Sequence, residues 1–361
     1  MIPPWPLRRL ILAPLVMALG AGLIVLSPVL ALLTILLRVL GLVQPGRLRW
    51  LRLLWLALIW FGGETAALVV SLGLWIASGF GGRMETKQYQ ARHYGLLRWF
   101  LGLVYGAAER VCGLQVTVRG PDDDPETDGE PAAANGEPAA ARPPLIVLSR
   151  HAGPGDSPLL VHYLLNVCHR RPRIVMKASL QLDPGLDVVT NRLPNVFIGR
   201  KAGAGIFTEQ ISRLASSLGD DDALVIFPEG GNWTPGRWRH GIRRLRRSGS
   251  ADLSRRAAAM PHLLPPRPGG VLAATKACPA ADVVFVAHTG LDQFASVADM
   301  WRNLPSGISV SAQCWRVPAD EVPRDADRDT QLDWLFGWWE KMNEWIATNR
   351  DDIPEPETTL K

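Results

Sequence analysis

The sequence predicts an α/β protein: a mixed, mostly buried sheet flanked by helices and preceded by an N-terminal helical membrane anchor. Two observations predict this class. Apolar residues make up 47% of the 361-residue chain, and near the N-terminus they form two long segments with almost no charge. From Gly113 onward, short β-branched runs alternate with helical patterns, and such alternation is typical of a buried sheet with helical connections.

The two apolar segments come first and define the anchor, residues 1–100. Residues 10–37 carry no charge, and residues 53–80 carry only Glu64. Both exceed the roughly 20 apolar residues that span a bilayer core. We expect Glu64 to be buried against a structural partner such as an arginine, although a carboxylate within a membrane segment often has a function.

Two topologies of the anchor stay open. Two full spans would place the arginines between the segments on the outer side, against the positive-inside tendency. Alternatively, helix breaks in the first segment would make it re-entrant and keep every basic cluster on the cytoplasmic side. The residues that would break it are Pro14, Gly20, Gly22 and Pro28.

The net charge of +5 is unevenly distributed. Residues 121–142 carry seven carboxylates against Arg142, so the rest of the chain is strongly basic. Together with the anchor, this favours an anionic membrane or a phosphorylated substrate over nucleic acid as partner. The acidic stretch at about 121–143 lacks large apolar side chains and is predicted to be a disordered insertion, and residues 351–361 a flexible tail. Four scattered cysteines indicate no metal site.

The elements after the anchor follow in order along the chain. Six apolar runs are predicted as strands: 114–118, 144–149, 173–177, 195–199, 223–228 and 282–288. Helices are predicted from Pro158 and over residues 205–218. Near the C-terminus, one helical face gathers Trp334, Leu335, Trp338, Met342, Trp345 and Ile346. We expect this face to pack on the core; the alternative is a helix on the membrane interface.

The stretch after the second strand carries the clearest chemistry. His151 follows the strand, and Gly153, Pro154 and Gly155 prevent a continuous helix before Asp156. Across such a turn, the carboxylate folds back onto the imidazole, fixes its tautomer and stabilises its protonated form. An imidazole so held is suited to accept a hydroxyl proton at neutral pH. Taken alone, this short pattern is more typical of a loop histidine beside a capping aspartate.

Three further blocks accompany this pair in a fixed order. The first has Phe197 and Ile198 in one strand and Arg200 just after it. The second has Phe227 and Pro228 at the end of another strand and Glu229 and Gly230 just after it, and the third is a last apolar strand, VVFVAH. The set resembles the glycerolipid acyltransferase family, which includes bacterial 1-acyl-sn-glycerol-3-phosphate acyltransferases. The resemblance covers about residues 113–316, and it identifies residues 101–350 as an acyltransferase domain.

The resemblance implies a role for each matched residue. His151 is the general base on an acceptor hydroxyl, and Asp156 orients it. Arg200 binds the acceptor phosphate, Glu229 and Gly230 shape the acceptor site, and amides near Gly230 and Gly231 are candidate donors to the developing oxyanion. The alternatives are a surface ion pair for Arg200 and a loop-holding carboxylate for Glu229.

The resemblance also implies the reaction and its place. A fatty acyl group moves from acyl-CoA or acyl-carrier protein, as co-substrate, to a lysophospholipid, most simply 1-acyl-sn-glycerol-3-phosphate. No cofactor is implied. The enzyme acts on membrane lipid at the cytoplasmic face of the cell membrane, and other lysophospholipid or glycolipid acceptors are the alternative.

This chain departs from the family pattern at a few motif positions, and these differences bear on which acceptor the protein binds. Arg150 stands where the family often has asparagine, and Gly231 and Asn232 stand where it often has threonine and arginine. Arginines elsewhere in the chain can supply the missing charge: Arg237, Arg239, Arg243, Arg244 or Arg267. The rival functions are a thioesterase or lipid hydrolase that uses the same histidine on water, and a non-enzymatic membrane-surface protein.

Overall fold

The computed structural model describes residues 3–41, 49–120, 142–153, 155–199, 204–291 and 307–350. Arg200, the predicted tail and nearly all of the predicted insertion therefore lie outside the described residues. The chain divides into two compact units. The first unit comprises Met1–Gln115, Pro158–Ala202 and Trp301–Ile308, and the second comprises Val116–Ser157, Gly203–Met300 and Ser309–Lys361.

The first unit begins with the apolar helices. α1 (Trp5–Leu7) continues through a π-helical turn, η1 (Arg8–Leu12), into α2 (Ala13–Val39), and α3 (Arg49–Ala77) follows. The stretches Trp5–Val39 and Trp50–Ala77 are long and apolar enough to cross a membrane. Many of their leucines, valines and isoleucines are exposed. A core helix of a soluble protein would bury them, so this surface suits lipid.

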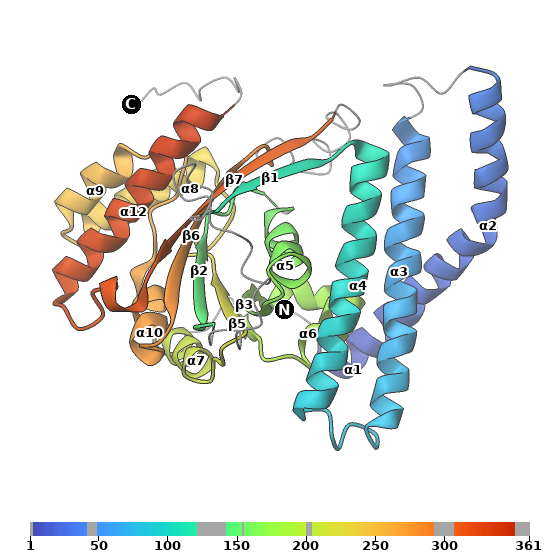
Figure 1. Ribbon diagram of the computed structural model, residues 1–361, viewed down its shortest axis with the longest axis horizontal. Coiled ribbons are helices and arrows are strands. Elements are labelled where there is room, and N and C mark those ends of the chain that lie inside the picture. The colour runs from blue at the N-terminus through green and yellow to red at the C-terminus, as the bar shows by residue number, and fades with distance from the viewer. Residues whose placement is uncertain are drawn as a thin grey trace, which may run out of the picture. The chain divides into compact units, whose positions relative to one another are not determined.

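Helix α2 runs without interruption through Gly20, Gly22 and Pro28. The re-entrant alternative expected these residues to break the helix, whereas α2 bends along its length but remains one continuous helix (Figure 1). A close contact between α2 and α3 explains why a glycine stands at position 20. A Cβ on Gly20 would lie 2.5 Å from the carbonyl oxygen of Phe61 on α3, so the glycine permits a close helix crossing rather than a break.

The remainder of the first unit holds α4 (Lys87–Cys112) and most of α5 (Asp156–Asn166), followed by short elements. These short elements are β3 (Arg171–Lys177), η2 (Ala178–Leu182), α6 (Pro184–Thr190) and β4 (Val196–Ile198). β3 and β4 are parallel, and residues Val175–Lys177 of β3 pair with β4. Helix α3 packs on both α2 and α4, so these three helices form the apolar part of the unit.

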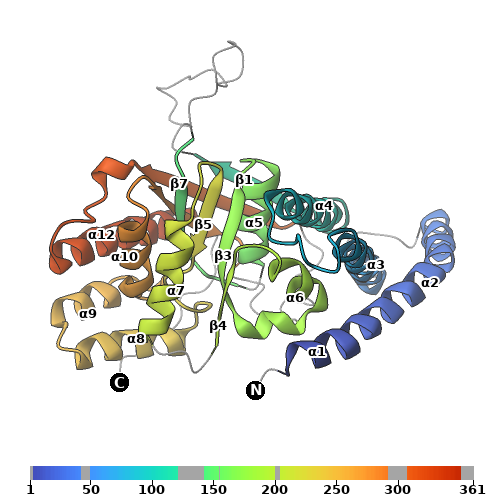
Figure 2. The same ribbon diagram turned by 90° about the horizontal axis from the view of Figure 1, so that it is seen from below.

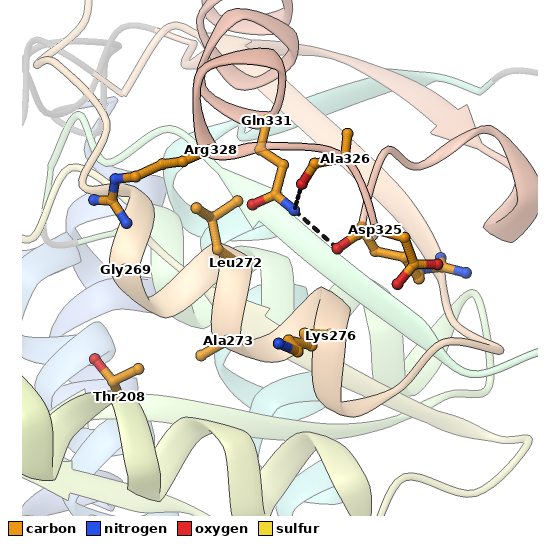
Figure 3. Close-up of a pocket in the computed structure, with 10 residues that line it drawn as sticks. Thr208, Gly269, Leu272, Ala273, Lys276, Asp325, Ala326, Arg328 and Gln331 are labelled. Carbon is orange, nitrogen blue, oxygen red and sulfur yellow. Dashed lines mark hydrogen bonds between the residues drawn. The ribbon is translucent and has the colours of Figure 1, made fainter.

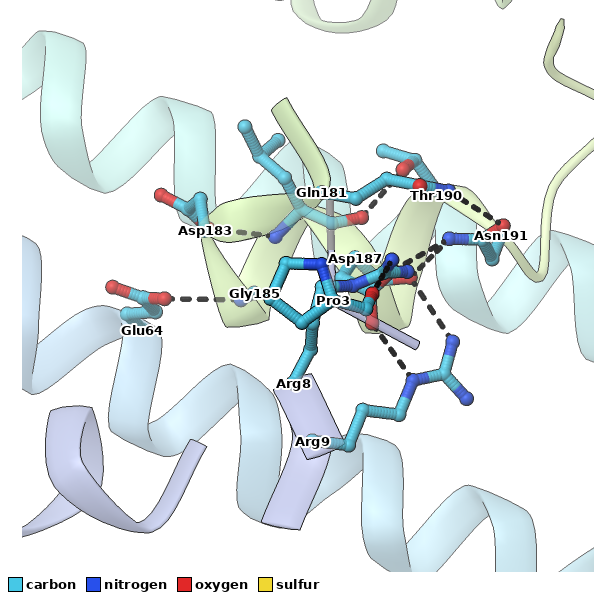
Figure 4. A network of polar contacts seen from close by, with 11 residues as sticks. Pro3, Arg8, Arg9, Glu64, Gln181, Asp183, Gly185, Asp187, Thr190 and Asn191 are labelled. Carbon is cyan, nitrogen blue, oxygen red and sulfur yellow. Dashed lines mark hydrogen bonds and ion pairs between the residues drawn. The ribbon is translucent and has the colours of Figure 1, made fainter. Parts of the chain in front are cut away.

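A polar network fixes the start of the chain to α6 (Figure 4). Arg8 and Arg9 both reach Asp187, with N–O distances of 2.7 and 2.8 Å, and Asp187 is almost fully buried. Nearby, the Oε1 atom of Glu64 accepts a hydrogen bond from the amide of Gly185 at 3.0 Å. Glu64 is thus buried against a structural partner, as expected, but that partner is a backbone amide and not an arginine.

The second unit is built on a mixed sheet (Figure 1). Its strands are β1 (Gln115–Arg119), β2 (Leu145–Ser149), β5 (Asp222–Ile226), β6 (Asp282–Thr289) and β7 (Ser309–Val317), and their order is β1-β7-β6-β2-β5. β2 pairs in parallel with β5 and β6, whereas β6 pairs antiparallel with β7. The central strand β2 is buried on both faces, and this confirms the prediction of a mostly buried sheet with helices around it.

Helices cover this sheet. They are α7 (Ala204–Ser216), α8 (Pro235–Arg247), α9 (Ala251–Ala258), α10 (Pro268–Ala277) and α12 (Arg328–Asn349), with a short turn η4 (Ala319–Glu321). α9, α10 and α12 lie on one side of the strands (Figure 2). Phe285 of β6 stacks on Trp338 of α12, with ring centroids 4.8 Å apart. Leu335, Met342 and Ile346 are fully buried, so α12 packs on the core, as predicted.

Candidate active site

His151 lies two residues beyond the last residue of β2, in the loop that leads to α5. Two backbone hydrogen bonds fix this loop. The amide of Arg150 donates to the carbonyl of Val286 at 3.1 Å, and the carbonyl of His151 accepts from the amide of Trp233 at 2.8 Å. Since β2 and β6 are parallel neighbours, the loop stands at the carboxyl ends of both strands, where α/β sheets commonly place their ligands.

Asp156 holds the imidazole of His151. The Nδ1 atom lies 3.0 Å from Oδ1 and 3.1 Å from Oδ2 of the carboxylate. Such a contact assigns the ring proton to Nδ1 and leaves Nε2 as the basic nitrogen. Among the described residues, Nε2 has no hydrogen-bond partner. The histidine side chain is 14% exposed and that of the aspartate 1%, so a substrate can reach the base but not its partner.

The carboxylate of Asp156 is stabilised in its ionised form. Burial by itself raises the pKa of Asp156, but the hydrogen bond with His151, the charges of His288 and His151 and the amide of Gly153 outweigh it and leave this pKa below the ordinary value. The amides of Gly153 and Ser157 donate at 3.0 and 2.6 Å. Asp156 is thus an anion that can stabilise a protonated imidazole.

His288 approaches the same carboxylate from β6. Its Nε2 atom lies 3.8 Å from Oδ2 of Asp156, and the residue is buried. Its carbonyl accepts from the guanidinium of Arg150, which is also buried. Sequence reasoning missed both roles. The only signal for His288 was its position at the end of the predicted last strand, and parallel pairing of β2 with β6 is what brings it to Asp156.

Glu229 joins the loop after β5 to the loop of His151. Its Oε1 accepts from the amide of His151 at 3.2 Å, and its Oε2 accepts from the amide of Leu264 at 3.3 Å. Burial raises the pKa of Glu229 to about 8, although the charge of Arg150 opposes this. The contacts are those of a carboxyl group that holds loops together, which was the alternative considered for this residue.

This raised pKa predicts a pH-dependent stability. A carboxyl group whose pKa is higher in the folded protein favours folding fully below its ordinary pKa, and this contribution is lost as the pH rises through about 8. Between about pH 5 and 8, unfolding free energy should fall by up to about 1.4 kcal/mol per pH unit from this group. Glu229→Gln removes the titration. Urea unfolding of both proteins at a series of pH values should therefore show a steeper fall of the unfolding free energy with pH for the wild type. Equal slopes of unfolding free energy against pH would show that Glu229 remains ionised.

Gly230 adopts a backbone that other residues rarely take, with a φ of +69°. A Cβ at this position would lie 2.9 Å from the guanidinium carbon of Arg267. Both the backbone conformation and the lack of space therefore disfavour a side chain here. The amide of Gly230 donates to the carbonyl of Phe227 at 3.0 Å. That amide is therefore occupied, and the prediction that it serves a developing oxyanion is not supported; the amide of Gly231 is the remaining candidate.

A cavity of about 580 Å³ lies elsewhere in the second unit, between α7, α10, the start of α12 and the segment that precedes α12 (Figure 3). Its lining includes Thr208, Leu272, Lys276 and Arg328. None of the predicted site residues lines it, so it is separate from the His151 site. Among the described residues, no cluster of three or more histidine, cysteine or acidic side chains is arranged to hold a metal ion.

Comparison with known families decides the class of this site. A family model described as Acyltransferase matches residues 116–284. This segment is an acyltransferase domain. It contains His151, Asp156, Glu229 and Gly230, together with Arg200. The resemblance drawn from the motifs is thereby confirmed for this segment, and the domain supports an acyltransferase enzyme that acts on lipids. No curated protein and no solved structure matches the chain.

Within the acyltransferase domain, the predicted site residues fall into two groups. His151, Asp156 and Glu229 are brought together by direct hydrogen bonds, and Gly230 follows Glu229 in the same loop. Arg200 lies outside the described residues.

Proposed function

We propose that the protein transfers a fatty acyl group from acyl-CoA or acyl-carrier protein to a hydroxyl of a lysophospholipid. The acceptor proposed is 1-acyl-sn-glycerol-3-phosphate, which gives phosphatidic acid. One observation carries the proposal: His151 is held by Asp156 through Nδ1 while its other nitrogen faces no partner among the described residues. That arrangement suits a base for an incoming hydroxyl group.

The proposed reaction follows from this geometry. Nε2 of His151 removes the proton of the acceptor hydroxyl as its oxygen attacks the thioester carbon. A C–O bond forms, the tetrahedral intermediate collapses, and the C–S bond breaks. The imidazolium, stabilised by Asp156, returns its proton to the departing thiolate, so that ester and thiol are the products. Holding both substrates in one site supplies the proximity, and no acyl-enzyme is required.

The experiment that tests the function uses the purified full-length chain. It is given radiolabelled acyl-CoA with a panel of lysophospholipids and glycolipids, and the labelled lipid product is separated and identified. The proposal expects phosphatidic acid from the phosphate monoester acceptor. Label in another lipid would support an alternative acceptor, while free fatty acid formed equally with and without acceptor would indicate a hydrolase.

Membrane attachment is part of the proposal. The exposed apolar surfaces of α2 and α3 support it, and the basic character of the chain suits the anionic cytoplasmic leaflet of the cell membrane. The acceptor would reach the site from that leaflet. In the same assay, activity should remain with membranes after washing at high pH and should be released by detergent.

Arg200 is proposed as a ligand of the acceptor phosphate, on the resemblance of its block to the family motif. Because that phosphate does not change charge during transfer, Arg200→Ala should raise KM for the acceptor about tenfold or more and leave kcat and the KM for acyl-CoA nearly unchanged. Arg200→Lys should rescue partly, since it lacks the two-pronged geometry. A rise confined to the KM for acyl-CoA would assign Arg200 to the donor instead.

A further inference from the structure

Arg267 stands directly against the loop that carries Glu229 and Gly230. The position of a Cβ on Gly230 lies 2.9 Å from Cζ, 3.0 Å from Nε and 3.1 Å from Nη1 of Arg267. The backbone amide of Arg267 donates to the carbonyl of Pro228 at 2.9 Å. Since Glu229 accepts from the amide of His151, one short loop separates this guanidinium from the proposed base.

Helix α8 brings two more arginines to the same place. Arg237, Gly241 and Arg244 are spaced by four and three residues and so share one face of the helix. A Cβ on Gly241 would lie 2.9 Å from the ring of Pro265, so this face packs on the segment that leads to Arg267. Arg237 also reaches back to the loop after Gly231, with its Nη1 donating to the carbonyl of Asn232 at 2.9 Å.

These three guanidinium groups form a cluster of like charge. Within the part of the chain that the structure describes, none of them has a carboxylate partner, whereas Arg255, Arg256 and Arg316 each do. Partial burial and the charges of Arg244 and Arg237 lower the pKa of Arg267. Mutual repulsion of this kind is relieved when an anion binds between the groups.

We propose that Arg267, Arg237 and Arg244 form an anion site that binds a phosphate of a substrate beside His151. The inference rests on the proposed function and names a substrate contact for it. Two sources offer the same chemistry: the phosphate of a lysophospholipid acceptor and the phosphates of coenzyme A. Both are dianionic or nearly so, and both suit several convergent guanidinium groups.

The experiment compares Arg267→Gln with the wild type on matched substrates. The acceptors are a lysophospholipid with a phosphate monoester and the monoacylglycerol that lacks it, and the donors are acyl-CoA and the same acyl group on pantetheine. Arg267→Gln should raise KM about 10- to 100-fold for one phosphate-bearing substrate and leave its phosphate-free counterpart unchanged. Arg246→Gln is the control, because Arg246 is as exposed as Arg237 and Arg244 but lies about 180° around α8 from Arg237.

Each outcome decides the proposal. A rise confined to the phosphorylated acceptor assigns the site to the acceptor, and a rise confined to acyl-CoA assigns it to the donor. Unchanged KM values, equal rises with phosphate-free substrates, or an equal effect of Arg246→Gln would overturn it. If Arg267→Gln fails to fold, Arg237→Gln and Arg244→Gln test the same site, with Arg267→Lys as a variant that keeps the charge.

A separate binding measurement distinguishes failure of the anion site from failure of the proposed function. If the wild type transfers an acyl group to no acceptor, the proposed function fails. Inorganic pyrophosphate, titrated calorimetrically into the detergent-solubilised protein, then tests the site alone. Wild type and Arg246→Gln should bind it, and Arg267→Gln should bind it at least about tenfold more weakly. Equal binding by all three proteins would refute the site.

Discussion

Replacing His151 by alanine will lower the kcat of acyl transfer by at least about 10²- to 10⁴-fold, the range that a positioned general base supplies. The ring is partly exposed, and the backbone of the residue makes the loop contacts to Trp233 and Glu229. Alanine keeps those backbone contacts, so the protein should remain folded and its KM values should change little. Steady-state kinetics and thermal unfolding of the purified variant measure both effects.

The control for this substitution is another histidine. His169 is exposed in the loop between α5 and β3 and has a φ of 52°, a conformation that asparagine tolerates well, so His169→Asn should retain full activity. Near wild-type turnover by His151→Ala would exclude His151 as the base, and the proposed mechanism would fail with it.

Asp156→Asn should be nearly as damaging to kcat, although it changes only one atom. The carboxylate accepts hydrogen bonds from His151, Gly153 and Ser157. An amide offers one acceptor and two N–H donors, so it opposes some of these donors and favours the wrong imidazole tautomer. We expect a loss of about 10²- to 10⁴-fold in kcat, with KM for both substrates changed little.

This variant also tests the charge on Asp156. Because its pKa is held below the ordinary value, the wild-type carboxylate stays ionised as the pH falls, and the stability that it contributes is lost only below the usual range of an aspartate. Unfolding of Asp156→Asn should therefore differ most from wild type at neutral pH, and the two proteins should converge in acid. A kcat close to that of wild type, in a variant that is stable at neutral pH, would show that His151 needs no charged partner.

The sequence predicted the parallel strands because each is an unbroken apolar run bounded by turn residues. β2, β5 and β6 begin and end within two residues of the predicted runs. β7 was missed, since Ser309–Val317 mixes small polar and charged residues with apolar ones, and its antiparallel place beside β6 shows only in the pairing. The face of α12 was predicted to pack on the core and does, with Phe336 and Trp339 added to the buried set.

The candidate site was predictable where it is local in sequence and unpredictable where it is not. His151 and Asp156 are five residues apart, and the glycines between them indicated a turn. His288 reaches the site from the end of the VVFVAH block on β6, but that block assigned it no role. Arg267 reaches the site from the start of α10 and was only one of five arginines considered for the missing charge. Only the strand order and the packing of α8 on Pro265 bring them there. The proposal for Arg200 still rests on its motif alone.

The attachment of α6 to the apolar helices limits how far α3 can enter a bilayer. The amide of Gly185 donates to Glu64, and the guanidinium of Arg192 donates to the carbonyl of Ser71. Helix α3 therefore makes polar contacts with α6 and the residues just after it, at Glu64 and at Ser71. On the N-terminal side of these contacts, α3 extends from Arg49 to Glu64, about 22 Å at the helical rise per residue. A hydrocarbon core is about 30 Å thick. In the proposed membrane-bound state, this part of α3 alone would therefore be too short to cross the bilayer, and the depth of α3 would depend on where α6 lies as well as on the length of its apolar sequence.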